Sequence, residues 1–146
     1  MVVGAQDAAR RRPVSLVGVA AAVVALGTDV MYVSIIRAQG TPPLTDGRFL
    51  FIATMIGVAG CAALAAAPAL SGALRLALIG FSTGTLISLG IAGIFSIGIF
   101  LLTAGTLAAI AWRRTRRTTV FRGATIVGWG PAAAGVASVF AGLFLT

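Results

Sequence analysis

The sequence predicts an all-helical protein that forms a bundle of five membrane-spanning helices. Three observations indicate this fold: 59% of the residues are hydrophobic, only 10% are charged, and apolar runs long enough to cross a bilayer recur along the chain. A soluble domain carries about 25% charged residues, so this chain has too few to cover itself in water. We therefore treat residues 1–146 as a single integral membrane domain.

The first two predicted spans cover residues 14–36 and 49–67. Between them lies a polar loop, residues 37–48, whose two glycines and two prolines interrupt helices and favour turns. Pro68 breaks the helical pattern after the second span. The two spans are therefore expected to be separate helices joined by a connection outside the bilayer.

Residues 73–112 are apolar almost throughout, and one straight helix of that length would measure about 60 Å. The hydrocarbon core of a bilayer is only about 30 Å thick. We therefore predict two spans, residues 73–89 and 94–112, with a tight reversal at Gly90 and Gly93.

The last predicted span covers residues 123–145 and contains Pro131. Proline cannot donate the backbone hydrogen bond that a helix interior needs, so a kink is expected there. A basic loop, residues 113–122, joins this span to the one before it.

The arginines give the predicted orientation. All eleven basic residues are arginine. With five crossings, the arginines before the first span lie on the same side as the basic loop, and cytoplasmic loops favour arginine. The N-terminus is therefore predicted inside and the C-terminus outside. Counting residues 73–112 as one span would separate the two arginine groups, which contradicts that rule.

The location follows from the same features. A composition with arginine but no lysine, glutamate or histidine is typical of a GC-rich bacterial genome. We therefore expect a multi-pass protein of the bacterial plasma (inner) membrane. A cleaved signal peptide is the alternative for the N-terminus, because small residues at Ala25 and Gly27 resemble a cleavage site. The apolar run continues past them, which favours a retained helix.

Asp29 is the main functional lead, because it places a carboxyl group inside the first span. An acid at the centre of a membrane helix costs about 2.5 to 3.5 kcal/mol on insertion and often marks an ion or proton pathway. Polar residues expected at similar depth, or able to reach it from the outer loop, would form a polar crevice with it. This candidate site comprises Asp29, Arg48, Thr85, Ser88, Ser96 and Ser138.

Two interpretations of Asp29 remain open. In the functional one it is a protonatable or cation-attracting site. In the structural one, which the sequence favours, Asp29 lies near the outer end of its helix. There Arg48, Tyr32 or the loop backbone satisfies its carboxylate. No second acid lies nearby in the sequence to relay protons.

The basic loop also has two interpretations. Five arginines could contact anionic lipid headgroups, each contributing about 1 kcal/mol near the surface: Arg113, Arg114, Arg116, Arg117 and Arg122. The simpler interpretation is that they only set the orientation of the chain, which needs no specific ligand.

Small residues recur every four positions on three of the predicted helices and allow close helix packing. Internal seams are the favoured interpretation, and contacts with a second copy are the alternative. The residues are Ala53, Gly57, Cys61 and Ala65; Gly80, Gly84 and Ser88; and Ala124, Gly128 and Ala132.

The two tryptophans have different expected roles. Trp112 is expected to anchor its helix at the membrane interface, and Trp129 is expected to pack beside Pro131.

Catalysis by this chain alone is not expected. The sequence has no histidine and no glutamate, and its one cysteine excludes an intrachain disulfide or a cysteine-based metal cluster. We therefore expect no enzyme activity, no cofactor, no metal site and no nucleic-acid partner, since the arginines are explained by topology.

Two classes of function remain. The first is a scaffold or accessory subunit, which packs in the lipid bilayer against copies of itself or within a larger membrane complex. The second is a small transporter or channel component that uses Asp29. Water around Asp29 would favour transport, and a dry, fully packed bundle would favour the scaffold.

Overall fold

A computed structural model describes residues 16–40, 47–66, 72–94, 96–118 and 124–145. Within these ranges the chain is all-helical and forms five helices. They are α2 (Leu16–Ala38), α3 (Gly47–Ala65), α4 (Gly72–Ala92), α5 (Gly98–Thr118) and α6 (Ala124–Leu145). The five predicted helices are thus confirmed, and the ends of α2, α3 and α6 lie within two residues of prediction.

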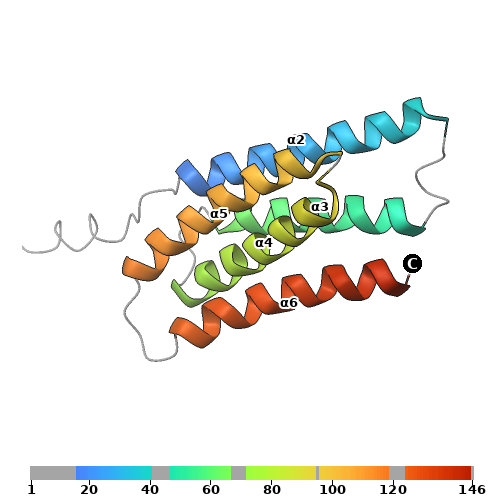
Figure 1. The fold of residues 1–146 in the computed structure, drawn as a ribbon. Coiled ribbons are helices and arrows are strands. Elements are labelled where there is room, and N and C mark those ends of the chain that lie inside the picture. The colour runs from blue at the N-terminus through green and yellow to red at the C-terminus, as the bar shows by residue number, and fades with distance from the viewer. Residues whose placement is uncertain (1–15, 41–46, 67–71, 95, 119–123, 146) are drawn as a thin grey trace, which may run out of the picture.

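Successive helices run in opposite directions along one bundle (Figure 1). One end, which we call the arginine end, contains the start of α4 with Arg75 and the end of α5 with four arginines. The other, which we call the pocket end, contains the end of α2 and the start of α3. Five of the arginines predicted to be cytoplasmic are described, and all five lie at the arginine end: Arg75, Arg113, Arg114, Arg116 and Arg117. Arg37 and Arg48, which are predicted to lie outside, are at the pocket end. Arg10, Arg11, Arg12 and Arg122 lie outside the described residues.

Three of the helices, α2, α3 and α4, are long and apolar enough to cross a membrane. Helix α5 does not qualify, because its arginines occupy its last two turns. In α6 the segment Trp129–Leu145 is apolar but shorter than a full span. Helix length and composition therefore indicate a membrane protein with at least three crossing helices among the described residues.

Helix α4 is central. It packs against α3, α5 and α6, while α2 packs against α3 and α5. Helix α6 lies on the far side of α4 from α2 (Figure 1). Eleven of the residues of α4 are buried. The main apolar core draws on all five helices and includes Ala25, Ile56, Leu86, Leu101 and Val139.

The reversal between α4 and α5 lies later in the chain than predicted. Helix α4 continues through Gly90 to Ala92, and the turn is closed by the backbone N–H groups of Ser96 and Gly98, which both donate to the Gly93 carbonyl. Gly90 is instead a packing position, because a Cβ there would lie 2.8 Å from Leu102 of α5. The sequence pattern correctly predicted a reversal near Gly90 and Gly93. It could not show that Gly93 closes the turn whereas Gly90 packs against α5.

Helix α2 is continuous from Leu16 to Ala38, through the small residues that resemble a cleavage site. It ends at Ala38, and the turn that follows contains Gly40, whose φ of +75° is readily adopted by glycine. Helix α6 likewise continues across Pro131. The expected kink at that position stays a prediction.

Glycines allow the closest approaches between helices. A Cβ on Gly84 of α4 would collide with the Ala132 carbonyl of α6, and a Cβ on Gly135 of α6 would lie 2.8 Å from the Phe81 carbonyl. A Cβ on Gly60 of α3 would meet Leu26 of α2 at 2.8 Å. The predicted small-residue seam is therefore internal at Gly84 and Ala132. On α3 the predicted face is only partly internal, since Cys61 and Ala65 are exposed.

Candidate functional site

Asp29 lies deeper in its helix than the sequence indicated. Helix α2 continues for nine residues beyond it, to Ala38, which corresponds to about 14 Å along the helix axis. The favoured interpretation assumed a position about one turn or more from the outer end, because twenty residues counted from Val14 reach Val33. At the observed depth the cost of inserting a charge approaches that of the helix centre, about 2.5 to 3.5 kcal/mol.

The carboxyl group of Asp29 faces helix α3. A Cβ built at Gly57 would lie 3.4 Å from Asp29 Oδ2, so the glycine leaves room for the carboxyl group beside the α3 backbone. The residue is half-buried. Its Oδ1 atom is buried and has no hydrogen-bond partner among the described residues. The sequence predicts that Arg48, Tyr32 or the loop backbone satisfies the carboxylate, and neither Arg48 nor Tyr32 bonds this oxygen.

The other polar residues of the predicted crevice do not gather around Asp29. Thr85 is buried in α4, where a Cβ on Gly135 of α6 would lie 2.7 Å from its Oγ1. Ser88 is buried and donates to the Gly84 carbonyl of its own helix. Ser138 is exposed on α6 and donates to the Ala134 carbonyl. Ser96 lines a pocket at the α4–α5 reversal, and Arg48 is exposed at the start of α3.

Seven of the described hydroxyl groups are satisfied within their own helices. They donate to the carbonyl four residues earlier at 2.7 to 2.9 Å: Thr28, Ser34, Thr83, Ser88, Thr103, Thr106 and Ser138. Such bonds satisfy a hydroxyl without any contact to a second helix. Thr85 Oγ1 and Ser82 Oγ differ from these seven, since both are buried without a partner in the described residues. The sequence analysis did not single out Ser82.

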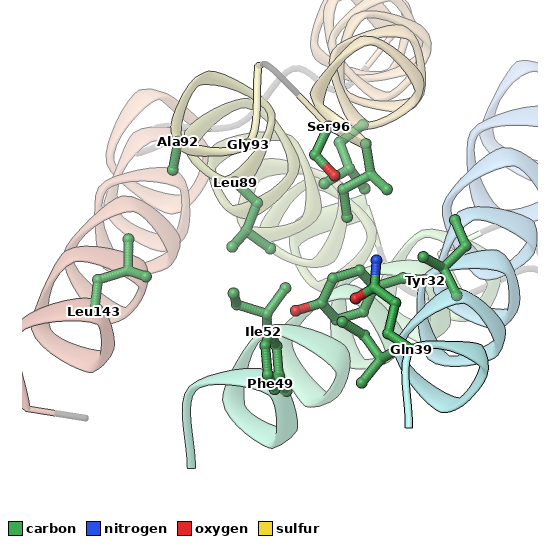
Figure 2. Close-up of a pocket in the computed structure, with 13 residues that line it drawn as sticks. Tyr32, Gln39, Phe49, Ile52, Leu89, Ala92, Gly93, Ser96 and Leu143 are labelled. Atoms are coloured by element: carbon green, nitrogen blue, oxygen red, sulfur yellow. The ribbon is translucent and has the colours of Figure 1, made fainter. Parts of the chain in front are cut away.

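A pocket of about 320 Å³ opens at the pocket end of the bundle, which we call the five-helix pocket (Figure 2). Side chains from α2, α3, α6 and the α4–α5 reversal surround it, and most are apolar. Three polar residues take part, and Figure 2 shows the amide of Gln39 and the hydroxyls of Tyr32 and Ser96 directed into the space between the helices. Sequence reasoning found Ser96 but missed the pocket, because its walls come from helix ends far apart in the chain.

A second, smaller pocket of about 80 Å³ lies beside it, between α2 and α3. Tyr32, Ile36 and Phe49 line both pockets, and Arg37 lines only the smaller one. The rings of Tyr32 and Phe49 lie 6.4 Å apart. Asp29 lines neither pocket, so the carboxyl group and these pockets are separate features.

The arginine end contains a hollow of about 190 Å³ lined by Ile110, Arg113, Arg114 and Arg117, which we call the arginine hollow. These residues are spaced by three or four along α5 and therefore share one helix face. The three arginines are exposed. Asp29, the acid of the described residues, lies in the half of α2 nearer the opposite end. Guanidinium groups gathered on one helix face suit an anionic group such as a phosphate.

The two tryptophans differ from expectation. Trp112 is only 9% exposed and belongs to an apolar cluster with Leu76 and Ile79, so the predicted anchoring at the membrane interface is wrong for this residue. Its ring packs edge-on against that of Trp129, with centroids 4.8 Å apart and an interplanar angle of 87°. The side chain of Trp129 therefore forms a packing contact between α6 and α5. Arg75 Nε and Trp112 Nε1 are buried without hydrogen-bond partners in the described residues.

Comparison with known protein families, with curated proteins and with solved structures finds no match to this chain. Among the described residues no group of three or more histidine, cysteine or acidic side chains is placed to hold a metal ion. Cys61 is a free thiol exposed on α3. Function is therefore argued from the geometry of this chain alone.

Proposed function

We propose that the chain is a multi-pass protein of the bacterial plasma membrane, with five crossings. In this proposal it acts as a scaffold or accessory subunit of a membrane assembly and is not an enzyme. The observation that carries this proposal is the way its hydroxyl groups are satisfied. Seven of them donate to their own helix, so these protons need neither water nor a partner helix to be satisfied.

The close glycine contacts support the same proposal. At Gly84 and Gly135 the backbones of α4 and α6 approach each other with no room for a Cβ. Such contacts give van der Waals packing that lipid cannot match. A rigid, closely packed bundle suits a structural subunit better than a carrier that must change shape.

One exposed face of α2 is suited to contact a partner. Leu16, Val23 and Val30 are exposed and spaced by seven, with Gly27 on the same face. Nothing in the described residues lies within 4 Å of a Cβ built at Gly27, so no packing among them accounts for this glycine. Small residues on an exposed membrane helix allow a second helix to approach closely. In this proposal the occupant of that face is a membrane helix of another subunit.

Copurification tests the proposal directly. The full chain, extracted from its native membrane in mild detergent, should elute with a defined second membrane protein that mass spectrometry identifies in constant ratio. Gly27→Leu should reduce that ratio, whereas Ala133→Leu, at an exposed position of α6, should leave it unchanged. Recovery of the wild-type chain as a monomer would contradict the scaffold proposal.

A second candidate function is a small transporter or channel component with Asp29 as its protonatable or cation-attracting site. The observation that favours it is the position of Asp29 within α2, together with the lack of a donor for its Oδ1 atom among the described residues. An unpaired intramembrane acid is costly and is often retained for a function. Proton or cation flux into proteoliposomes that Asp29→Asn abolishes would support transport over the scaffold. A flux unaffected by Asp29→Asn would count against it.

Anionic lipids are the proposed partner of the arginine end. The arginine hollow collects Arg113, Arg114 and Arg117 on one face of α5 and places Ile110 beside them. A phosphate group suits the guanidinium groups, and an acyl chain suits the isoleucine. This proposal is independent of the protein partner at α2.

A further inference from the structure

We propose that the five-helix pocket binds a neutral amphipathic small molecule, with its hydrogen-bonding head among Tyr32, Gln39 and Ser96 and its hydrocarbon body against the apolar walls. This inference goes beyond the scaffold proposal and does not depend on it. It concerns a site that binds a ligand from the membrane rather than a protein partner.

The size and composition of the pocket carry the inference. Its volume of about 320 Å³ lies at the small end of the range of about 300–1,000 Å³ that ligand sites occupy. Ten of its thirteen lining residues are apolar, among them Phe49, Ile52, Leu89 and Leu143. Ligand sites are typically apolar with a few convergent polar groups, and this pocket has that composition.

The polar groups are placed together rather than scattered. Gln39 comes from the end of α2, and Ser96 comes from the reversal between α4 and α5. Figure 2 shows their side chains and that of Tyr32 directed into the same space. An amide and two hydroxyls offer both donors and acceptors, which suits a carbonyl or hydroxyl head.

The absence of charge in the lining selects a neutral ligand. None of the lining residues is an acid, an arginine or a lysine. The nearby Arg37 lines the smaller pocket and not this one. An anionic or cationic head placed here would find no opposite charge in the lining to compensate for any water it loses.

Photolabelling in nanodiscs tests the inference. The purified full chain is incubated with a long-chain alcohol that carries a diazirine near its hydroxyl group, illuminated, digested and mapped by mass spectrometry. Labelling should be saturable and concentrated on peptides that contain Tyr32, Gln39, Phe49 and Ser96. A diazirine fatty acid of equal chain length, ionised at the working pH, should label these peptides less.

A variant that fills the pocket provides the structural control. Ser96→Trp should lower labelling of the lining peptides by about tenfold, the factor that corresponds to 1.4 kcal/mol of lost binding. Ser138→Trp, at an exposed serine outside the pocket, should leave labelling unchanged. Elution at the wild-type position on gel filtration shows that each variant is folded.

Three outcomes would overturn the inference. The first is labelling spread evenly over the exposed faces of the helices. The second is labelling of the lining peptides that Ser96→Trp does not change. The third is equal labelling by a diazirine hydrocarbon without a head group, which would show that the pocket holds acyl chains with no role for its polar side chains.

Discussion

At the residue scale, the glycines of this chain occupy two kinds of position, one at a close helix contact and one on an exposed helix face. Gly84 lies where α4 meets the backbone of α6, and a Cβ there would collide with the Ala132 carbonyl. Gly27 lies on an exposed face of α2, and a Cβ there would meet nothing within 4 Å. Both are helix-interior glycines in the sequence, so helix propensity affects them alike. Only tertiary contacts distinguish them.

This contrast gives a matched prediction. Gly84→Ala should lower the free energy of unfolding by about 1 to 3 kcal/mol, because the added methyl group forces α4 and α6 apart. Gly27→Ala should leave it unchanged or slightly higher, since alanine is the better helix former. Thermal unfolding of both variants in the same detergent measures the difference. Equal stability of the two variants would contradict the described α4–α6 contact.

Thr85 offers a second test at this scale. Its hydroxyl is buried without a partner in the described residues, against Gly135 of α6. Thr85→Val should therefore cost little stability or increase it, because the variant removes a desolvated polar group and keeps the shape. Ser88→Ala, which removes a hydroxyl bonded to the Gly84 carbonyl, is the control and should not stabilise. The same unfolding measurement compares them. A large loss of stability in Thr85→Val would show that the hydroxyl has a partner after all.

At the element scale, α5 differs from the other helices. Its first fifteen residues are apolar and its last two turns carry four arginines, so the helix continues past the apolar segment. The sequence analysis placed these arginines in a loop, because charge ended the apolar pattern at Trp112. Helical structure fixes the spacing of Arg113, Arg114 and Arg117, which a loop would not do. This spacing is what makes the arginine hollow a candidate site.

The arginine hollow leads to a prediction about lipid. In nanodiscs made from phosphatidylglycerol and phosphatidylcholine, the protein should enrich phosphatidylglycerol. Arg113→Gln combined with Arg117→Gln should weaken this enrichment, because each arginine near the surface contributes about 1 kcal/mol. Arg37→Gln, at the pocket end, is the control. Lipid mass spectrometry measures the ratio, and an equal effect of Arg37→Gln would indicate nonspecific attraction by net charge.

At the scale of the whole molecule, the number and direction of the helices follow from the sequence. The limit set by bilayer thickness divided residues 73–112 into two helices, and the structure contains both. Their exact junction did not follow, because Gly90 and Gly93 have similar local signals. One packs against Leu102 and the other accepts the hydrogen bonds of the turn.

The candidate site was less predictable than the fold. Depth estimated from the sequence placed Ser138 with Asp29, but the rotation of α6 exposes this serine. Which side of a helix faces inward depends on the helices that it packs against. For α2 these are α3 and α5, and for α6 the main neighbour is α4, and the sequence alone does not show these pairings. The five-helix pocket has the same origin, since it exists only where the ends of several helices meet. Ser96 could be selected from the sequence as a candidate site residue, because it lies near the predicted reversal between two spans.

The central claim is that the chain crosses the membrane five times with its arginine end in the cytoplasm. Labelling of single cysteines tests it most directly, in a Cys61→Ser background that removes the native thiol. On intact cells an impermeant maleimide should label Gln39→Cys at the pocket end. It should label Arg117→Cys at the arginine end only after permeabilisation. Labelling of Arg117→Cys on intact cells, with Gln39→Cys protected, would contradict the account.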